Sequence, residues 1–271
     1  MDEPVDTTST VLPNLLIAGV QKGGTTWLHA ILGSHEDVFM SRVKELRYFD
    51  AFARVRSETA WREYLAHFAD AGSYRYRGES TPGYCWVKDG DSPFSPARPR
   101  HDTATEIRAR LGHDAHVVVL LRNPVDRAQS AAHHHFALGR LGVETPIWGA
   151  PTRLGIVDMG FYKRHLSAFR RVFDPARLHI MIYEDLMANP RSFLIDLSRR
   201  LDISCRSDWL DGLALYERLN SREFVSGRYR GDGLTYRGFS GTDRNRLAHL
   251  YSDDVAYVRA LLRRNVWQEA R

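Results

Sequence analysis

Three short apolar runs stand out along the chain, and each has the length of one buried strand. They are residues 14–19, 116–121 and 177–183. Each is rich in Leu, Ile or Val and too continuously apolar to alternate between a buried and an exposed face. The run 116–121 (HVVVLL) is the strongest of them, since valine favours the extended conformation. We therefore predict three buried strands, with 116–121 near the centre of its sheet.

Between and after these runs, apolar residues recur at helical spacing. The expected helices are residues 25–34, 58–70, 102–112, 189–202, 208–219 and 242–264, with a further helix after Pro124. The proline-rich segment 88–101 and the glycine- and arginine-rich segment 226–241 are expected to be loops. Because strands alternate with helices, the chain is predicted to be α/β with a central, mainly parallel sheet flanked by helices.

Composition narrows the class of protein. Hydrophobic residues make up 43% of the 271 residues, which excludes a disordered chain. No apolar run reaches the roughly 18 residues of a membrane helix, and the polar, acidic start does not resemble a secretory signal. We expect a cytoplasmic protein without membrane partners, formed by one domain over 1–271 with a flexible tail at 1–12. Cys85 and Cys205 are expected to be reduced thiols.

The charge of the chain suits an anionic ligand. The formal net charge is +5, and only four of the 38 basic residues are lysines. These basic residues are too scattered to indicate nucleic acid, for which basic clusters interleave with aromatic residues. An anionic cofactor or substrate fits such a mildly basic surface.

The first apolar run is followed by Lys22-Gly23-Gly24-Thr25-Thr26 and the start of a helix. A glycine-rich turn and a helix N-terminus direct backbone N–H groups at one point, where they bind anions. The common nucleotide loop places its lysine after the glycines, whereas here the lysine precedes them. The segment predicts a phosphate-binding loop of a different kind.

The end of the expected strand 116–121 also indicates an anion site. In metal-dependent P-loop enzymes the corresponding strand commonly ends in an aspartate that helps to hold Mg²⁺. Here it ends in Arg122, whose guanidinium can bind a phosphate directly. Ser130 lies eight residues further on and could add a hydroxyl. The sequence thus predicts two anion sites and no metal site between them.

These segments resemble a known family. GVQKGGTTWL (19–28) resembles the 5′-phosphosulfate loop, and LLRNPVDRAQS (120–130) the 3′-phosphate motif, of sulfotransferases that use 3′-phosphoadenylyl sulfate (PAPS). VKELRYFD (43–50) and GESTPGY (78–84) are similar to the K-E-x-x-[FY]-F and E-K-[TS]-P-x-Y segments of the heparan sulfate branch. Residues 160–190 resemble its helix, strand and acidic turn. The resemblance implies a P-loop-like three-layer fold.

The implied activity is transfer of a sulfuryl group from PAPS to a hydroxyl, or less readily an amine, of a carbohydrate or small-molecule acceptor. The product of the donor is PAP, and no metal is required. Glu45 is implied as the general base, Lys22 as the group that stabilises the leaving phosphate, and Lys44 as a cation near the sulfonate. The implied cofactor-binding residues are Lys22, Gly23, Gly24, Thr25, Thr26, Trp27, Arg122, Ser130, Gly227 and Arg228.

Two positions depart from the branch. Ser80 stands where the branch has a lysine, so the contribution of that lysine must be absent or come from elsewhere. Of the branch's C-terminal K-G-R loop only Ser226-Gly227-Arg228 is a candidate.

Histidine is the rival base, because its pKa suits proton transfer at neutral pH. Residues 133–135 are consecutive histidines, which cannot share one face of a helix, so a three-histidine metal site is not expected. The candidate acceptor contacts are His133, His134, Tyr84, Trp86 and Trp148. Both tryptophans could equally pack locally.

Two other classes remain open at this stage. A P-loop small-molecule kinase would use the same strand–loop–helix unit, although its Gly-Lys-Ser/Thr order and metal-binding aspartate are missing. A non-catalytic nucleotide or sulfated-glycan binder would use both anion sites, but would leave Lys44 and Glu45 without a role.

Overall fold

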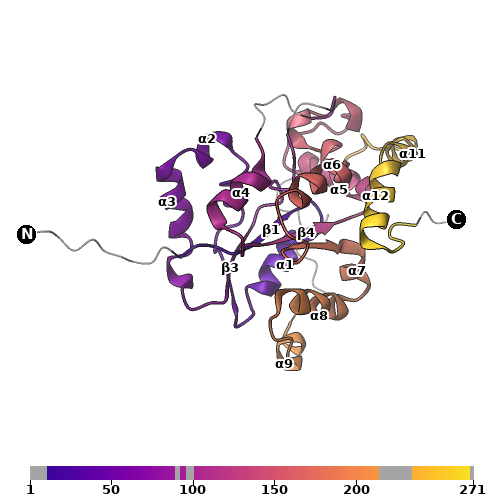
Figure 1. Cartoon of the computed structure of the whole chain (residues 1–271). Helices are drawn as coiled ribbons and strands as arrows, with labels where there is room; N and C mark the ends of the chain where they lie inside the picture. The colour runs from indigo at the N-terminus through magenta and orange to yellow at the C-terminus, as the bar shows by residue number, and fades with distance from the viewer. Residues whose placement is uncertain (1–10, 89–91, 96–100, 214–233, 269–271) are drawn as a thin grey trace, which may run out of the picture.

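The computed structural model describes residues 11–88, 92–95, 101–213 and 234–268 and contains one five-stranded sheet (Figure 1). Its strands are β1 (Leu15–Gly19), β2 (Val38–Met40), β3 (Tyr76–Ser80), β4 (His116–Leu121) and β5 (Leu178–Ile182). They run in the order β2-β3-β1-β4-β5, and every neighbouring pair is parallel. The three expected strands are confirmed, and the α/β class with them.

Strands β2 and β3 were not expected from the sequence. β2 has three residues, too few for a periodic signal. β3 reads YRGES and is largely polar, so its own residues do not favour a buried strand. It forms because β1 and β2 pair with it on either side, at Leu15↔Gly78 and Met40↔Gly78. Met40 packs closely against Gly78, and a side chain there would displace it, since an added Cβ would lie 2.6 Å from the Met40 sulfur.

Helices fill most of the remaining described chain. The α-helices are α1 (Thr25–Leu32), α2 (Phe52–Val55), α3 (Glu58–Ala66), α4 (Thr103–Leu111), α5 (Pro124–Ala137), α6 (Tyr162–Arg170), α7 (Tyr183–Ala188), α8 (Pro190–Leu201), α9 (Ser207–Asp211), α11 (Gly241–Leu250) and α12 (Ser252–Leu262). Short 3₁₀ turns are η1 (Ala69–Ala71), η2 (Ile147–Gly149), η3 (Thr152–Leu154) and η4 (Asp158–Gly160). No described helix combines the length and apolarity required to cross a membrane.

Two predicted helices differ from the observed ones. The segment expected as one helix over 242–264 is two helices that meet at Tyr251. Tyr251 is buried, and its hydroxyl donates to the Val157 carbonyl (2.6 Å), which ties the junction to the η4 region. The segment expected over 208–219 contains α9, and its part beyond 213 lies outside the described residues, as does most of the expected tail at 1–12.

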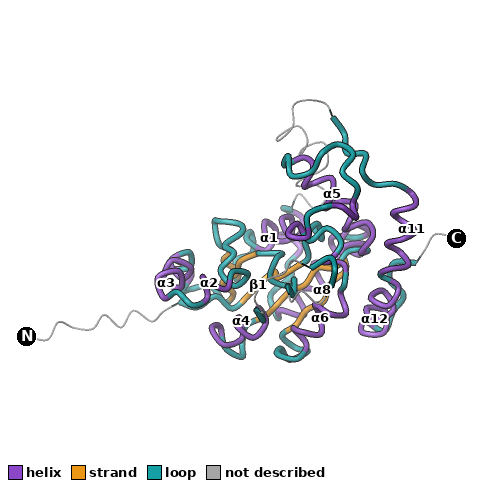
Figure 2. The backbone as a smooth tube through the Cα atoms, turned by 90° about the horizontal axis from the view of Figure 1, so that it is seen from above, coloured by secondary structure: helices purple, strands orange, loops and turns teal. Residues whose placement is uncertain are grey.

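Helices cover both faces of the sheet. Figure 2 shows α1 on one side of the strands and α4 and α6 on the other. Alternate residues of β1 and β4 supply the two cores: Leu16 and Val117 belong to the cluster with α4 and α6, while Leu15 and Val118 belong to the cluster with α1 and α8. A third cluster joins α5 to α11. The three-layer arrangement follows, because the central strands β1 and β4 carry apolar residues on both faces.

All five strands are parallel, so their carboxyl ends lie at one edge of the sheet. In sheets of this kind ligands bind outside that edge, in the loops that follow the strands. The segments after β1, β4 and β2 contain Lys22, Arg122 and the Lys44-Glu45 pair. The fold therefore brings Lys22 and Arg122, which are 100 residues apart in the sequence, to the same edge of the sheet.

Candidate active site

The loop between β1 and α1 is shaped by contact with β4. The Val20 N–H donates to the Leu120 carbonyl (2.9 Å), and the Gly23 N–H donates back to the Val20 carbonyl (2.9 Å). An added Cβ at Gly23 would lie 2.4 Å from the Leu120 carbonyl oxygen, so only glycine fits. Gly24 has a φ of 93° and is the N-cap of α1. The turn thus requires both glycines, for different reasons.

The first turn of α1 presents its backbone rather than its side chains. Gly24 makes no side-chain cap, so the leading N–H groups of α1 remain directed out of the helix. Thr25 is buried, Thr26 is half-buried, and Trp27 packs into the core between α1 and the sheet. Trp27 therefore fixes the helix that carries the loop, while the anion-binding groups are the N–H donors, Lys22 and the hydroxyls.

Arg122 lies against this loop. Its Nη1 donates to the Lys22 carbonyl (3.2 Å), and its guanidinium lies 4.8 Å from the centre of the Tyr183 ring. Its own backbone is held by the Tyr162 hydroxyl, which donates to the Arg122 carbonyl (2.6 Å). The two segments expected to bind anions are thus adjacent. Ser130 lies two turns along α5 and is half-buried.

The acidic turn after β5 supports the same arginine. Glu184 accepts the Asn123 N–H (2.9 Å), and the Asn123 side chain caps α5 by accepting from the N–H groups of Val125 and Asp126. Tyr183 and Glu184 were not predicted as site residues. Their position directly after a buried strand could have identified them, because ligands bind at the carboxyl ends of parallel strands.

Lys44 and Glu45 form an ion pair at the same edge of the sheet. The Lys44 Nζ lies 3.7 Å from the Glu45 carboxylate, and the two side chains are 17% and 37% exposed. Burial lowers the pKa of the Lys44 ammonium from its ordinary value, against the opposing charges of Glu45 and Glu79. Glu45 is thus the accessible carboxylate of the pair, and Lys44 is the more buried cation.

Glu79 of β3 is a carboxyl group that the sequence did not single out. It is wholly buried, and this burial raises its pKa to about 7, although hydroxyl groups of Tyr84, Thr81 and Tyr64 donate to it. Its position at the start of the E-x-[TS]-P-x-Y segment could have identified it as a site residue. A buried carboxylate next to a catalytic candidate is a frequent mark of a functional site.

The consecutive histidines have three different environments. Burial and the Lys22 charge lower the pKa of His134 to about 3, so its imidazole is neutral at pH 7. Its Nδ1 is buried and bonded to none of the described residues. His135 is buried, with Nε2 3.1 Å from the Leu154 carbonyl, and the His133 ring packs edge-on against Tyr236. His134 is thus the histidine associated with the Lys22 loop.

The three aromatic residues predicted to contact the acceptor make most of their contacts with other residues of the protein. Tyr84 is 1% exposed and lies in the core, so it does not form an acceptor surface. The Trp86 indole N–H donates to Asp158 (2.6 Å). The Trp148 N–H donates to Asp243 (2.6 Å), and the Arg246 guanidinium covers the Trp148 ring at 4.1 Å. Both tryptophans thus make local contacts, and their contact with an acceptor stays a prediction.

Two further expectations have different outcomes. Ser80 is fully buried and its hydroxyl has no partner among the described residues, so position 80 contributes no cation at the strand edge. Gly227 and Arg228 lie outside the described residues.

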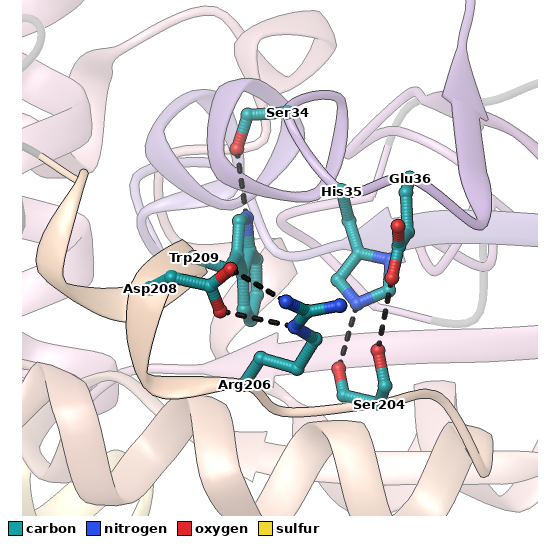
Figure 3. A pocket seen from close by; sticks show the side chains of 7 residues that line it. All are labelled: Ser34, His35, Glu36, Ser204, Arg206, Asp208 and Trp209. Atoms are coloured by element: carbon teal, nitrogen blue, oxygen red, sulfur yellow. Dashed lines mark hydrogen bonds and ion pairs between the residues drawn. The ribbon is translucent and has the colours of Figure 1, made fainter.

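A cavity of about 370 Å³ lies elsewhere, at the other end of α1 (Figure 3). Its lining residues are Ser34, His35, Glu36, Ser204, Arg206, Asp208 and Trp209. The polar groups in it bond to one another: Arg206 pairs with Asp208 (2.9 Å), and the Trp209 N–H donates to the Ser34 hydroxyl (3.1 Å). None of the expected site residues lines it, so it is separate from the anion-binding loops.

Comparison with known proteins places the chain in a family. Residues 12–219 match the model of the sulfotransferase domain, which covers well over half of the sequence. The chain belongs to the sulfotransferase domain family, and the resemblance drawn from the two loops is confirmed.

Curated relatives are similar over part of their length. Bifunctional heparan sulfate N-deacetylase/N-sulfotransferase 2 of Homo sapiens is 24% identical over 211 residues, which is 71% of this chain and 22% of the relative. Membrane-associated sulfotransferase kil1 of Dictyostelium discoideum is 30% identical over 138 residues, which is 50% of this chain and 25% of the relative. The chain spans about a quarter of the length of these relatives.

Solved structures share the fold. A sulfotransferase from Alicyclobacillus acidocaldarius has a TM-score of 0.64 at 20% identity, with 94% of this chain and 98% of that chain covered. Mouse sulfotransferase SULT7A1, solved in complex with PAP, has a TM-score of 0.51 at 12% identity, with 92% and 84% covered. The expected P-loop-like three-layer fold is confirmed.

Proposed function

We propose that this chain transfers a sulfuryl group from PAPS to a hydroxyl, or less readily an amine, of a carbohydrate or small-molecule acceptor, without a metal ion. The observation that carries the proposal is the contact between Arg122 and the Lys22 carbonyl, since it joins the two anion-binding strand ends. We further propose that the chain acts as one catalytic domain.

The residues at the loop fit a bisphosphate nucleotide. Gly23 and Gly24 carry no side chains, so the backbone N–H groups there can approach a phosphate closely. Lys22 supplies a full positive charge at the same point, and Arg122 with Ser130 supplies a second site one strand away. The relatives support this assignment: mouse sulfotransferase SULT7A1 was solved with PAP, and the human relative is named for heparan sulfate N-sulfotransfer.

Glu45 is proposed as the base because it is the accessible carboxylate at this edge. When bound, PAPS supplies the sulfuryl group, and the residues of the site position and stabilise charge around it. Glu45 takes the proton from the acceptor oxygen, Lys22 stabilises charge on the leaving phosphate, and Lys44 lies beside Glu45 as a cation for the transferred group. His134, which is neutral at pH 7, is proposed to contact the acceptor.

The first test is calorimetric titration with PAP in EDTA, beside ATP and ADP. We expect tight binding of PAP that requires its 3′-phosphate, and at least tenfold weaker binding in Arg122→Ala, because a charge-assisted bidentate contact is lost. The matched control is Arg191→Ala, since Arg191 of α8 pairs with Asp211 of α9 away from the anion-binding loops. A preference for Mg-ATP, or unchanged PAP binding in Arg122→Ala, would replace this proposal with the kinase interpretation.

A further inference from the structure

The segment that contains Lys44 and Glu45 is held by two hydroxyl groups from the turn after β3. The Arg47 N–H donates to the Thr81 hydroxyl oxygen (3.2 Å), and the Tyr48 N–H donates to the Tyr84 hydroxyl oxygen (3.0 Å). Both N–H groups lie within three residues of Glu45. The backbone position of the proposed base therefore depends on where these two oxygens lie.

Both hydroxyls are oriented by one carboxylate. The Thr81 hydroxyl donates to Glu79 Oε2 (2.8 Å), and the Tyr84 hydroxyl also donates to Glu79. A hydroxyl has a single proton, so a hydroxyl that donates to Glu79 must turn its lone pairs elsewhere. At Thr81 and Tyr84 those lone pairs receive the N–H groups of the 47–48 backbone. Glu79 thus sets the direction of both bonds.

We propose that Glu79 is a positioning residue for the transfer reaction: through Thr81 and Tyr84 it holds the 44–48 segment in the geometry that presents Glu45 to the acceptor. The inference rests on the proposed function, in which Glu45 is the base. It also gives a reason for the spacing of E-x-[TS]-P-x-Y in residues 79–84, because its Glu, Thr and Tyr are the three members of this relay.

The location of Glu79 supports a role beyond filling space. β3 is paired with both β1 and β2, and Glu79 itself lies opposite Leu16 of β1. Its carboxylate also interacts with the charge of Lys44. A glutamine at this position could orient the two hydroxyls only in part, since its amide N–H₂ would donate to one of them where the carboxylate accepts.

The chain offers a matched control in Tyr64. Its hydroxyl also donates to Glu79 (3.4 Å), from α3, and its ring is as buried as that of Tyr84. The Tyr84 hydroxyl receives a backbone N–H from the 44–48 segment, whereas Tyr64 stacks its ring on Tyr48 at 4.9 Å. Tyr64→Phe keeps this stacking. Each of the two Tyr→Phe variants therefore removes one hydroxyl that interacts with Glu79, and only Tyr84→Phe releases the segment.

The first measurement is hydrogen exchange at the Arg47 and Tyr48 amides, which requires no acceptor. We expect faster exchange at Tyr48 in Tyr84→Phe, at Arg47 in Thr81→Val, and at both in Glu79→Gln, with Tyr64→Phe and Thr81→Ser close to the unmodified protein. Thermal melts identify any variant that has lost its fold. Equal exchange in Tyr84→Phe and Tyr64→Phe would overturn the relay.

The second measurement is the rate of PAP formation from PAPS, with water or the acceptor found in a screen. Glu79→Gln and Tyr84→Phe should lower kcat by about 10- to 100-fold, because an error of about 1 Å in a reacting group has that effect. Their affinity for PAP should stay within about twofold, since the donor loops are untouched. Tyr64→Phe should retain kcat, and an equal loss there would contradict a positioning role.

PAP binding, hydrogen exchange and turnover together distinguish a failure of the proposed function from a failure of the Glu79 role. If the unmodified protein does not bind PAP, the proposed function fails whatever the exchange rates are. If PAP binds and turnover occurs, but kcat is insensitive to the relay variants, only the positioning role of Glu79 fails.

Discussion

Glu45 and Glu79 are two carboxyl groups in one site with opposite environments. Glu45 is partly exposed beside Lys44, while Glu79 is enclosed by hydroxyl groups and its pKa is raised to about 7 by burial. A proton acceptor must reach the substrate, which favours Glu45. A group that fixes backbone geometry must be shielded from water, which favours Glu79. Solvent exposure therefore divides the two roles between residues of the same type.

Glu45→Gln is the direct test at this scale. The amide preserves size and polarity but cannot take a proton, so we expect kcat to fall by about 10²- to 10⁴-fold. PAP affinity measured by calorimetry should stay within about twofold, because no donor contact is removed. Glu63→Gln, an exposed glutamate on α3, is the control. Near-normal turnover in Glu45→Gln would move the base to another residue, with His134 the first candidate.

At the scale of elements, the donor loop between β1 and α1 is shaped by β4 as well as by β1. β1 supplies the loop, but the Leu120 carbonyl at the end of β4 receives the Val20 N–H and lies where a side chain at Gly23 would be. Tyr183, at the start of α7 after β5, also packs against the loop: a Cβ added at Gly24 would lie 3.0 Å from its ring. The loop geometry is thus set by its neighbours as much as by its own residues.

Gly23→Ala tests this dependence. The added methyl group meets a backbone oxygen that cannot turn away, so we expect a loss of about 1–3 kcal/mol in the free energy of unfolding. We also expect at least tenfold weaker PAP binding, since the N–H groups are displaced from the anion. At Gly149 an added Cβ meets nothing within 4 Å, so Gly149→Ala is the matched control. Equal stability and equal PAP binding in both variants would exclude the close approach of β4 as a requirement.

For the whole molecule, buried histidines dominate the response to acid. Burial is the first cause of a lowered pKa at six of them: His29, His116, His134, His135, His165 and His179. Five of these pKa values are lowered to about 4 and one to about 3. Between about pH 6.5 and pH 4 the unfolded chain therefore binds more protons than the folded one, and stability falls as the pH falls. Glu79 and Asp254, whose pKa values burial raises to about 7 and about 6, act in the opposite direction.

We expect the histidines to prevail because they outnumber these two carboxyl groups. The melting temperature at pH 5 should be lower than at pH 7 by about 5 °C or more. His179→Asn should reduce this difference, since His179 is buried and its Nε2 lies 2.8 Å from His116 Nδ1. His67→Asn, at an exposed position, should leave it unchanged. A melting temperature that rises on acidification would show that the carboxyl groups prevail instead.

The predictions from sequence succeeded where local residues determine structure. β1 is apolar throughout, β4 and β5 are apolar except for His116 and His179, and the turn from Lys22 to Thr26 has its own glycines. β3 was missed because Arg77 and Glu79 oppose a buried strand locally, and only pairing on both sides places them there. For the same reason the buried role of Glu79 and Tyr84 was not foreseen. The adjacency of Lys22 and Arg122 was suggested by the motif spacing, but the order of the strands was not.

The central position of β1 has a consequence for how the chain is made. The Lys22 loop is synthesised before the groups that it contacts, because the Leu120 carbonyl and Arg122 follow about a hundred residues later. Of the two neighbours of β1, β3 (Tyr76–Ser80) is synthesised well before β4 (His116–Leu121). During translation β1 can pair with β3 but lacks its other neighbour until β4 has been made, and parallel pairing of this kind forms slowly. The ability to bind an anion should arise abruptly, once β4 and the turn after it have left the ribosome, rather than grow with chain length.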